Sequence, residues 1–189
     1  MAEILIVSSS GKAAALLQDL LPPELRVGIQ ALSSGSSARR QLAQADYDLI
    51  LINAPLTDEP GEALAAEAAQ CSAAGVLLLV KNELVDDVSV RVEDFGVFVL
   101  GKPLSRPLFY QALKLAQSAH KRMMGLRQEN QRLQNRIEEI RRIDRAKCVL
   151  IQSLGMTEDQ AHRYIEKQAM DLRLSRRQVA EAILKTYEP

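Results

Sequence analysis

The chain has 189 residues, of which 47% are hydrophobic and 25% charged, and its formal net charge at pH 7 is zero. This length can hold one large domain, or a medium-sized domain and a small one. Its apolar runs are far shorter than the roughly 20 residues of a membrane span, and its first residues lack the basic segment of a signal peptide, so we expect a cytoplasmic protein without a membrane partner.

The first 104 residues alternate short apolar runs with helical patterns. Near-continuous runs of Val, Ile and Leu are typical of strands that are covered on both faces. The predicted strands are Ile4–Val7, Arg26–Ala31, Leu49–Ile52, Val76–Val80 and Val97–Leu100, and the predicted helices span residues 11–21, 35–44, 60–71 and 84–94. This alternation predicts an α/β fold with a doubly wound, five-stranded parallel sheet.

A further helix is predicted to begin near Arg106, with Ser105 as its N-cap, and it has no evident end before about residue 153. Between Pro107 and Gly155 the sequence contains no proline and only one glycine, Gly125, and the next proline is Pro189. The segment is therefore one long helix, or two helices with a kink at Gly125.

The middle of this helix carries a heptad pattern. Its members recur at alternating spacings of three and four residues, and they are Met123, Leu126, Asn130, Leu133, Ile137 and Ile140. Asn130 occupies an a position, where a buried asparagine favours a parallel, in-register dimer. Arg136 and Arg141 would repel each other across such a dimer. The pattern predicts a coiled coil over residues 122–142, and the alternative is a helix that packs only on its own domain.

Two short helices are predicted after Gly155, each opened by a capping box. Thr157 and Gln160 form the first box, and the helix over residues 158–171 would bury Ala161, Tyr164, Ile165, Ala169 and Leu172. Ser175 and Gln178 form the second box, and the last helix would bury Val179, Ala182 and Ile183. Helices this short must pack on the long helix, against Ala146, Leu150, Ile151 and Leu154, to give a small all-α unit of three helices.

The N-terminal half resembles a two-component receiver domain. The match places the phosphate acceptor at Asn53 and the acidic pair that holds Mg²⁺ at Ser8 and Ser9. The hydroxyl position falls on Val80 or Lys81, the switch aromatic falls on Val99, and only Lys102, followed by Pro103, is retained. An amide does not replace a carboxylate nucleophile, and hydroxyls are poor replacements for the charged oxygen ligands of Mg²⁺. We therefore expect a pseudo-receiver over residues 1–121 that has no phospho-acceptor and needs no metal or other cofactor.

The C-terminal unit, residues 137–187, resembles the ANTAR domain, an RNA-binding antitermination module. The resemblance rests on the stretches 143–150, 155–161, 164–165, 169–170, 175–180 and 182–184, with Cys148 where the family has glycine. It implies a transcription antiterminator that binds paired small hairpins in leader RNA as a dimer. Phosphorylation would not control such a protein; control would come from a partner protein, a ligand or sequestration.

The charge distribution agrees with a polyanionic partner. Residues 1–104 contain 7 Lys and Arg against 14 Asp and Glu, whereas residues 105–189 contain 17 against 10. A solvated helical face can have the same composition, so the pattern is not specific. Cys71 and Cys148, the two cysteines, lie far apart and are expected to be reduced thiols.

Cations, helix N-termini and planar side chains are the groups that recognise phosphates and splayed bases of RNA. The candidate RNA-binding residues of the C-terminal unit are Arg145, Lys147, Thr157, Gln160, Arg163, Tyr164, Arg173, Arg176 and Arg177. Tyr164 could stack on a base, although its spacing with Ala161 and Ile165 favours a place in the core.

Two other functions remain open from the sequence. A DNA-binding response regulator would place a helix of the C-terminal unit in a major groove, and a protein-interaction scaffold would bind no nucleic acid. An enzyme is not expected, because the chain has no Gly-rich phosphate loop, no metal-ligand spacing and only His120 and His162 as histidines.

Overall fold

The computed structural model describes residues 3–187 and divides into two compact units, Met1–Gly125 and Leu126–Pro189. The first unit contains a five-stranded parallel sheet with the strand order β2-β1-β3-β4-β5. Its strands are β1 (Ile4–Ser8), β2 (Ile29–Leu32), β3 (Leu49–Asn53), β4 (Gly75–Lys81) and β5 (Phe98–Lys102). The predicted fold class is therefore confirmed.

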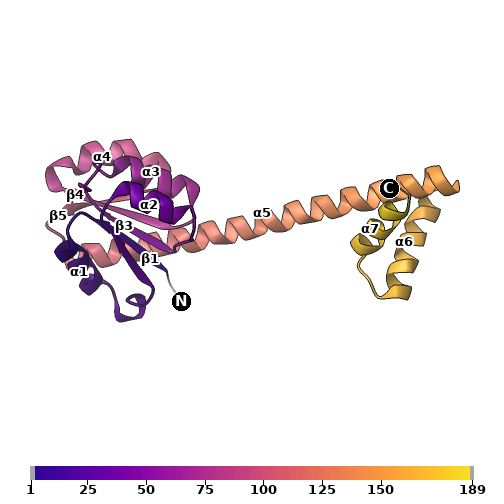
Figure 1. Cartoon of the computed structure of the whole chain (residues 1–189), viewed down its shortest axis with the longest axis horizontal. Helices are drawn as coiled ribbons and strands as arrows, with labels where there is room; N and C mark the ends of the chain where they lie inside the picture. Colours follow the sequence, from indigo (N-terminus) through magenta and orange to yellow (C-terminus); the bar gives the residue numbers. More distant parts are fainter. Residues whose placement is uncertain (1–2, 188–189) are drawn as a thin grey trace. The chain divides into compact units, whose positions relative to one another are not determined.

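Helices cover both faces of this sheet (Figure 1). The helices of the first unit are α1 (Gly11–Leu20), α2 (Gly35–Leu42), α3 (Glu62–Cys71), α4 (Val85–Val92) and the first part of α5 (Arg106–Leu154), with short 3₁₀ helices at Pro23–Leu25, Asn82–Leu84 and Glu93–Phe95. Alternate residues of each strand point to opposite faces. Leu5 and Ile50 pack under α2, α3 and α4, whereas Ile4 and Leu49 pack under α1 and α5.

The predicted strand Arg26–Ala31 begins three residues too early. Residues Pro23–Leu25 form a 3₁₀ helix, and Gly28 has a φ of 82°, which an extended strand does not allow. The pairing with β1 therefore starts at Ile29, opposite Ile4. Hydrophobic periodicity cannot detect this turn, because Val27 and Ile29 suit a strand and a turn boundary equally well.

α5 is a single helix of 49 residues, without an interruption at Gly125. Its first turns are held on the sheet by Phe109, Ala112, Leu113 and Ala116, which are all buried. Gly75 permits this packing, since a Cβ atom there would lie only 2.4 Å from the backbone oxygen of Ala116. Residues 121–138 of α5 are all exposed.

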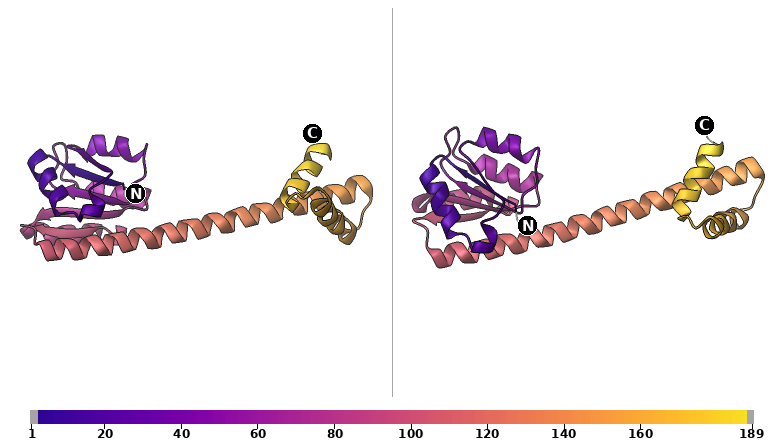
Figure 2. Two further views of the ribbon diagram at one scale, coloured as in Figure 1. Left: turned by 90° about the horizontal axis from the view of Figure 1, so that it is seen from below. Right: turned by 60° about the horizontal axis from the view of Figure 1, so that its bottom comes forward.

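The second unit packs the end of α5 against α6 (Glu158–Leu172) and α7 (Arg176–Tyr187), as Figure 1 and Figure 2 show. Its buried core consists of Ala146, Val149, Leu150, Ala161, Ile165, Val179, Ala180 and Ile183. Both predicted capping boxes are present, with Thr157 and Gln160 on α6 and Ser175 and Gln178 on α7. The predicted three-helix arrangement is therefore confirmed.

Several side chains that we expected in this core are exposed, and these predictions were wrong. They are Tyr164, Leu172, Ala182, Ile151 and Leu154. In a unit of three packed helices, each helix buries only the narrow stripe that faces the other two. On α7 this stripe contains Ala180 in place of Ala182, and on α6 it leaves Tyr164 38% exposed. Within residues 3–187, no helix combines the length and apolar character needed to cross a membrane.

Candidate functional site

The polar residues at the carboxyl edge of the sheet meet as the receiver resemblance implies. Ser8 and Asn53 are paired across β1 and β3, and the Asn53 Nδ2 donates a 3.0 Å hydrogen bond to the Ser8 Oγ. Lys102 ends β5 and donates through Nζ to the Asn53 Oδ1 at 3.0 Å and to the Ala54 carbonyl. Ser9 donates to the Pro55 carbonyl at 3.0 Å. The cluster is thus closed by its own hydrogen bonds.

This cluster lacks the charges of an acceptor site. No carboxylate forms an ion pair or hydrogen bond with Lys102 among the residues that the structure describes. Burial lowers the pKa of Lys102, and the nearby Lys81 ammonium lowers it further. Val80 is buried, and Val99 pairs with Leu78 inside the sheet. Both side chains are aliphatic, so they supply neither the hydroxyl nor the switch aromatic of a receiver. In this cluster the Lys102 ammonium group is therefore held by the neutral oxygens of Asn53 and Ala54.

The loop after Asn53 is tied to α2 by Asp58. The two carboxylate oxygens of Asp58 accept hydrogen bonds of 2.8 Å and 2.9 Å from the N–H groups of Gly35 and Ser36. These groups belong to the first turn of α2, where N–H groups have no partner within the helix. The bonds lower the pKa of Asp58 below its usual value of 3.8, because they favour the charged form.

We expect Asp58→Asn to loosen the start of α2 at neutral pH. The folded-state pKa of Asp58 is lowered, so its contribution to stability is present above the usual pKa and is lost as the pH falls through the folded-state pKa. Amide hydrogen exchange at Gly35 and Ser36, followed by NMR, should become faster in the variant at pH 7. The difference from wild type should vanish well below pH 3.8. Equal exchange rates at pH 7 would show that Asp58 does not hold this turn.

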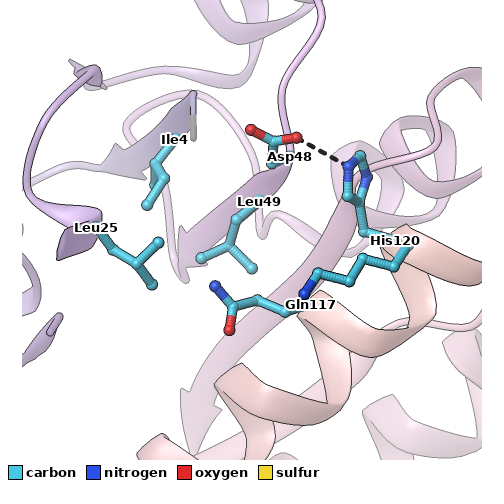
Figure 3. Close-up of a pocket in the computed structure, with 7 residues that line it drawn as sticks. Ile4, Leu25, Asp48, Leu49, Gln117 and His120 are labelled. Carbon is cyan, nitrogen blue, oxygen red and sulfur yellow. Dashed lines mark ion pairs between the residues drawn. The ribbon is translucent and has the colours of Figure 1, made fainter. Parts of the chain in front are cut away.

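A cavity of about 360 Å³ lies at the opposite edge of the sheet, where β1 and β3 begin. Figure 3 shows His120 of α5 beside Asp48 at one side of it, with Ile4 and Leu25 at the other. The His120 Nε2 lies 2.8 Å from the Asp48 Oδ1, and its Nδ1 lies 2.8 Å from the Ala73 carbonyl oxygen. Asp48 also accepts a hydrogen bond from the Glu3 N–H. These contacts anchor α5 on the first unit, which is a structural role.

The candidate RNA-binding residues at the start of α6 already have partners within the unit. Thr157 and Gln160 hold each other in the capping box at 2.9 Å and 3.3 Å. The Lys147 Nζ lies 2.8 Å from Asp144 and 3.3 Å from Glu158, and these contacts, with Asp144 as the larger influence, raise its pKa. Arg145, two residues earlier on α5, is exposed. The Lys147 ammonium is therefore fixed at the α6 N-terminus in its charged form.

One face of α6 presents polar and aromatic side chains to solvent. Gln160, Arg163, Tyr164 and Lys167 follow the three- and four-residue spacing that places side chains on the same face of a helix, and all four are exposed. No carboxylate pairs with Arg163 within the described part of the chain. Lys167 was missed in the sequence, although its spacing from Arg163 and Tyr164 was a usable signal.

A second group of cations surrounds the turn between α6 and α7. Arg176 lies 3.3 Å from Glu166, which also lies 3.3 Å from His162, and Arg177 lies 3.0 Å from Glu181. Beside this turn is an open hollow of about 350 Å³, lined by Glu166, Ala169, Met170, Leu174 and Arg176. Sequence spacing alone did not reveal this hollow, because α6 and α7 both contribute to it.

Arg173 adopts an unusual backbone conformation in this turn. It ends α6 with φ 54° and ψ 39°, the left-handed region, and is the only non-glycine residue with a positive φ among residues 3–187. The Leu174 N–H reaches back to the Ala169 carbonyl at 3.0 Å, as in a glycine-ended helix. A side chain in this conformation is unfavourable by about 1–2 kcal/mol, so an arginine where glycine would be unstrained points to a role for the guanidinium group.

We expect Arg173→Gly to stabilise the second unit and to weaken the RNA binding that the ANTAR resemblance implies. The free energy of unfolding should rise by up to about 1 kcal/mol, because glycine has no Cβ to strain. If the unit binds RNA as this resemblance implies, the RNA affinity measured by filter binding should fall several-fold through loss of the cation. Arg173→Lys, which keeps both the charge and the strain, is the matched control. If Arg173→Gly binds RNA as tightly as wild type, Arg173 is not an RNA contact.

The heptad residues of α5 form an apolar row on the surface of the single chain. Met123, Leu126, Leu133, Ile137 and Ile140 are between 46% and 60% exposed, and Asn130 between them is exposed as well. No part of the described chain covers this row, which we call the seam. The seam groups apolar side chains in one row along the helix, whereas exposed apolar side chains on a monomer are usually scattered singly.

Comparisons with known proteins identify the second unit. Residues 131–184 match the ANTAR domain family. The Transcriptional regulatory protein PdtaR of Mycobacterium tuberculosis is 32% identical over 140 residues, which are 74% of this chain and 68% of that protein. The Aliphatic amidase regulator of Pseudomonas aeruginosa is 33% identical over 95 residues, which are 50% of this chain and 47% of that protein.

Solved structures resemble the first unit in fold. The signal receiver domain of an HD domain-containing protein from Pseudomonas fluorescens has a TM-score of 0.56 and 23% identity, and covers 66% of this chain and 92% of that one. The receiver domain of a signal transduction histidine kinase from Syntrophus aciditrophicus has a TM-score of 0.53 and 24% identity, with 62% and 91% covered. With the sequence match to PdtaR along most of its length, the chain belongs to the ANTAR-domain transcriptional regulators that carry a receiver-like domain in front of the ANTAR domain.

Proposed function

We propose that this protein is an RNA-binding transcription antitermination regulator that acts as a dimer on paired hairpins in leader RNA. The observation that carries the proposal is the ANTAR match over the three-helix unit, which presents the cations Arg145, Arg163 and Arg173 on its surface. Nascent transcripts lie in the cytoplasm, where we expect the protein to act by binding, without catalytic turnover. Folded hairpins fit this surface better than long single strands, because the chain has no Trp, four Tyr and three Phe for base stacking.

The exposed seam supports a dimer. A parallel coiled coil would cover its apolar side chains and pair Asn130 with its twin. Each dimer would then present two three-helix units, one for each hairpin of the RNA. The proposed domain division follows from this: a pseudo-receiver over residues 1–121, a coiled coil over residues 122–142 and an RNA-binding unit over residues 137–187.

The test compares three ligands by filter binding with the full chain: an RNA with two adjacent small hairpins, an RNA with one hairpin, and duplex DNA of the same length. We expect the two-hairpin RNA to bind most tightly, with an affinity that falls linearly with salt concentration on logarithmic axes. Tighter binding to the duplex DNA would favour a DNA-binding response regulator. Absence of any salt-dependent binding to all three would favour a protein-interaction scaffold.

Phosphorylation does not control the protein in this proposal. Asn53 has an amide where the acceptor carboxylate would be, and its neighbours Ser8 and Ser9 supply hydroxyls in place of metal-binding carboxylates. A regulatory protein or a ligand that binds the receiver-like unit would carry the signal instead.

We expect acetyl phosphate with Mg²⁺ to leave the wild-type chain unlabelled, as measured by intact mass spectrometry. Asn53→Asp restores a carboxylate but not the metal ligands, so its labelling should stay at least about tenfold slower than that of a receiver with a complete acidic pair. A phosphorylated wild-type peptide that contains position 53 would contradict the proposal. Equal helicity of wild type and variant by circular dichroism is the control for folding.

A further inference from the structure

A large open cavity adjoins Asn53 on the α1 side of the sheet. It has a volume of about 620 Å³ and lies between α1, the end of β5 and the start of α5. Leu16, Leu17 and Leu20 of α1 form one wall, and Leu104 lies in the opposite one. Leu16 is 59% exposed, so apolar surface is presented to solvent here. We call this cavity the α1 groove.

The polar side of the α1 groove is cationic. The half-buried Lys102 and the exposed Arg106 both line it, and Lys81, which is paired with Lys102 across β4 and β5, adds a third positive charge nearby. No Asp or Glu side chain lines the groove within the described chain. The Lys102 ammonium is satisfied only by the neutral oxygens of Asn53 and Ala54.

This combination of groups selects a ligand class. A half-buried ammonium without a carboxylate partner attracts an anion, since a charged hydrogen bond there is less screened by water than one on a fully exposed side chain. The neighbouring leucine side chains favour an apolar body. A volume of about 620 Å³ lies within the roughly 300–1,000 Å³ of small-molecule sites, which are typically apolar with a few placed polar groups.

We propose that the α1 groove binds a small amphipathic anion, with its carboxylate, sulfonate or phosphate group on Lys102 and Arg106 and its apolar body against α1. A receiver needs carboxylates at this edge to hold a cation. Their replacement by Ser8, Ser9 and Asn53 leaves the lysine uncompensated, which converts the edge from a cation site to an anion site. The site lies in the first unit, so it stands whether or not the second unit binds RNA.

The test uses two fluorescent probes of similar shape with the full chain. The anionic probe is 8-anilinonaphthalene-1-sulfonate, and the neutral probe is N-phenyl-1-naphthylamine, which lacks the sulfonate. We expect saturable binding of the anionic probe at one site per chain, with tighter binding than the neutral probe. Amide NMR shifts should change in residues 13–20 and 102–106.

Three variants locate the site. Lys102→Met should weaken the anionic probe at least about tenfold and leave the neutral probe unchanged, because it removes the charge and keeps the apolar volume. Leu16→Glu, at an exposed position, should weaken the anionic probe without disturbing the core. Lys12→Met is the matched control and should bind the anionic probe as tightly as wild type does. Lys12 is an exposed lysine of α1 that does not line the groove.

The outcomes separate the proposal from simple apolar binding. Equal affinity of the two probes, or an unchanged anionic affinity in both Lys102→Met and Leu16→Glu, would overturn the anion site. Absence of saturable binding of either probe would overturn the groove as a small-molecule site and favour a protein partner on α1. If Lys102→Met does not fold, as judged by its urea unfolding curve, Leu16→Glu decides the result alone.

Discussion

Leu133→Glu should convert the proposed dimer into a monomer. Leu133 occupies a d position in the middle of the seam and is 51% exposed in the single chain. In the proposed coiled coil, the substitution would bury two like charges against each other without a partner. An unpaired buried charge costs about 3 kcal/mol or more, so the dimer dissociation constant should rise more than about 100-fold. Light scattering after size-exclusion chromatography measures the change.

The same variant should lose affinity for the two-hairpin RNA by about 10²–10⁴-fold, because two linked units bind two linked sites with a high effective concentration. Its affinity for the single hairpin should stay within about twofold of wild type, since each three-helix unit is intact. Gln128→Glu, which adds the same charge at the f position on the outer side of α5, is the control and should remain dimeric. A monomeric wild type, or a Leu133→Glu variant that still dimerises, would remove the seam from the proposal.

Arg163→Glu should weaken RNA binding by about 10–100-fold and uniformly across hairpin sequences. Arg163 is exposed on the α6 face that also presents Tyr164 and Lys167, and the proposed dimer would carry it twice. Loss of one phosphate contact per unit should reduce the slope of log affinity against log salt by about 2 for the dimer. Filter binding at several salt concentrations provides both quantities.

Two further variants make this result specific. Arg163→Lys keeps the charge and should restore most of the affinity and the salt slope. Lys114→Glu reverses a charge on the part of α5 that packs on the sheet, where Lys114 lies over the Tyr110 ring, and should leave RNA affinity unchanged. A wild-type salt slope in Arg163→Glu would show that RNA does not contact this face of α6.

The receiver-like edge illustrates how much the sequence could predict. The positions of Ser8, Asn53 and Lys102 followed from the resemblance to a receiver domain, whose parallel strands end at the same edge of the sheet. The structure adds that their side chains bond to each other at 3.0 Å and that the α1 groove opens beside them. The groove could not be predicted, since its walls come from α1, β5 and α5, which are far apart in the sequence.

The sequence by itself determined the local features of this protein: the strand and helix pattern, both capping boxes, the spacing of the seam and the missing carboxylates at positions 8, 9 and 53. Those features depend on neighbours within about two helical turns or on the identity of single residues. Only the tertiary structure decided which side chains are buried and which charges are paired. Tyr164 is exposed, Lys147 is held by Asp144 and Glu158, and Lys102 has no carboxylate partner among residues 3–187. Burial and pairing depend on the elements that meet in space, and periodicity along one helix carries no information about the shape of its neighbours.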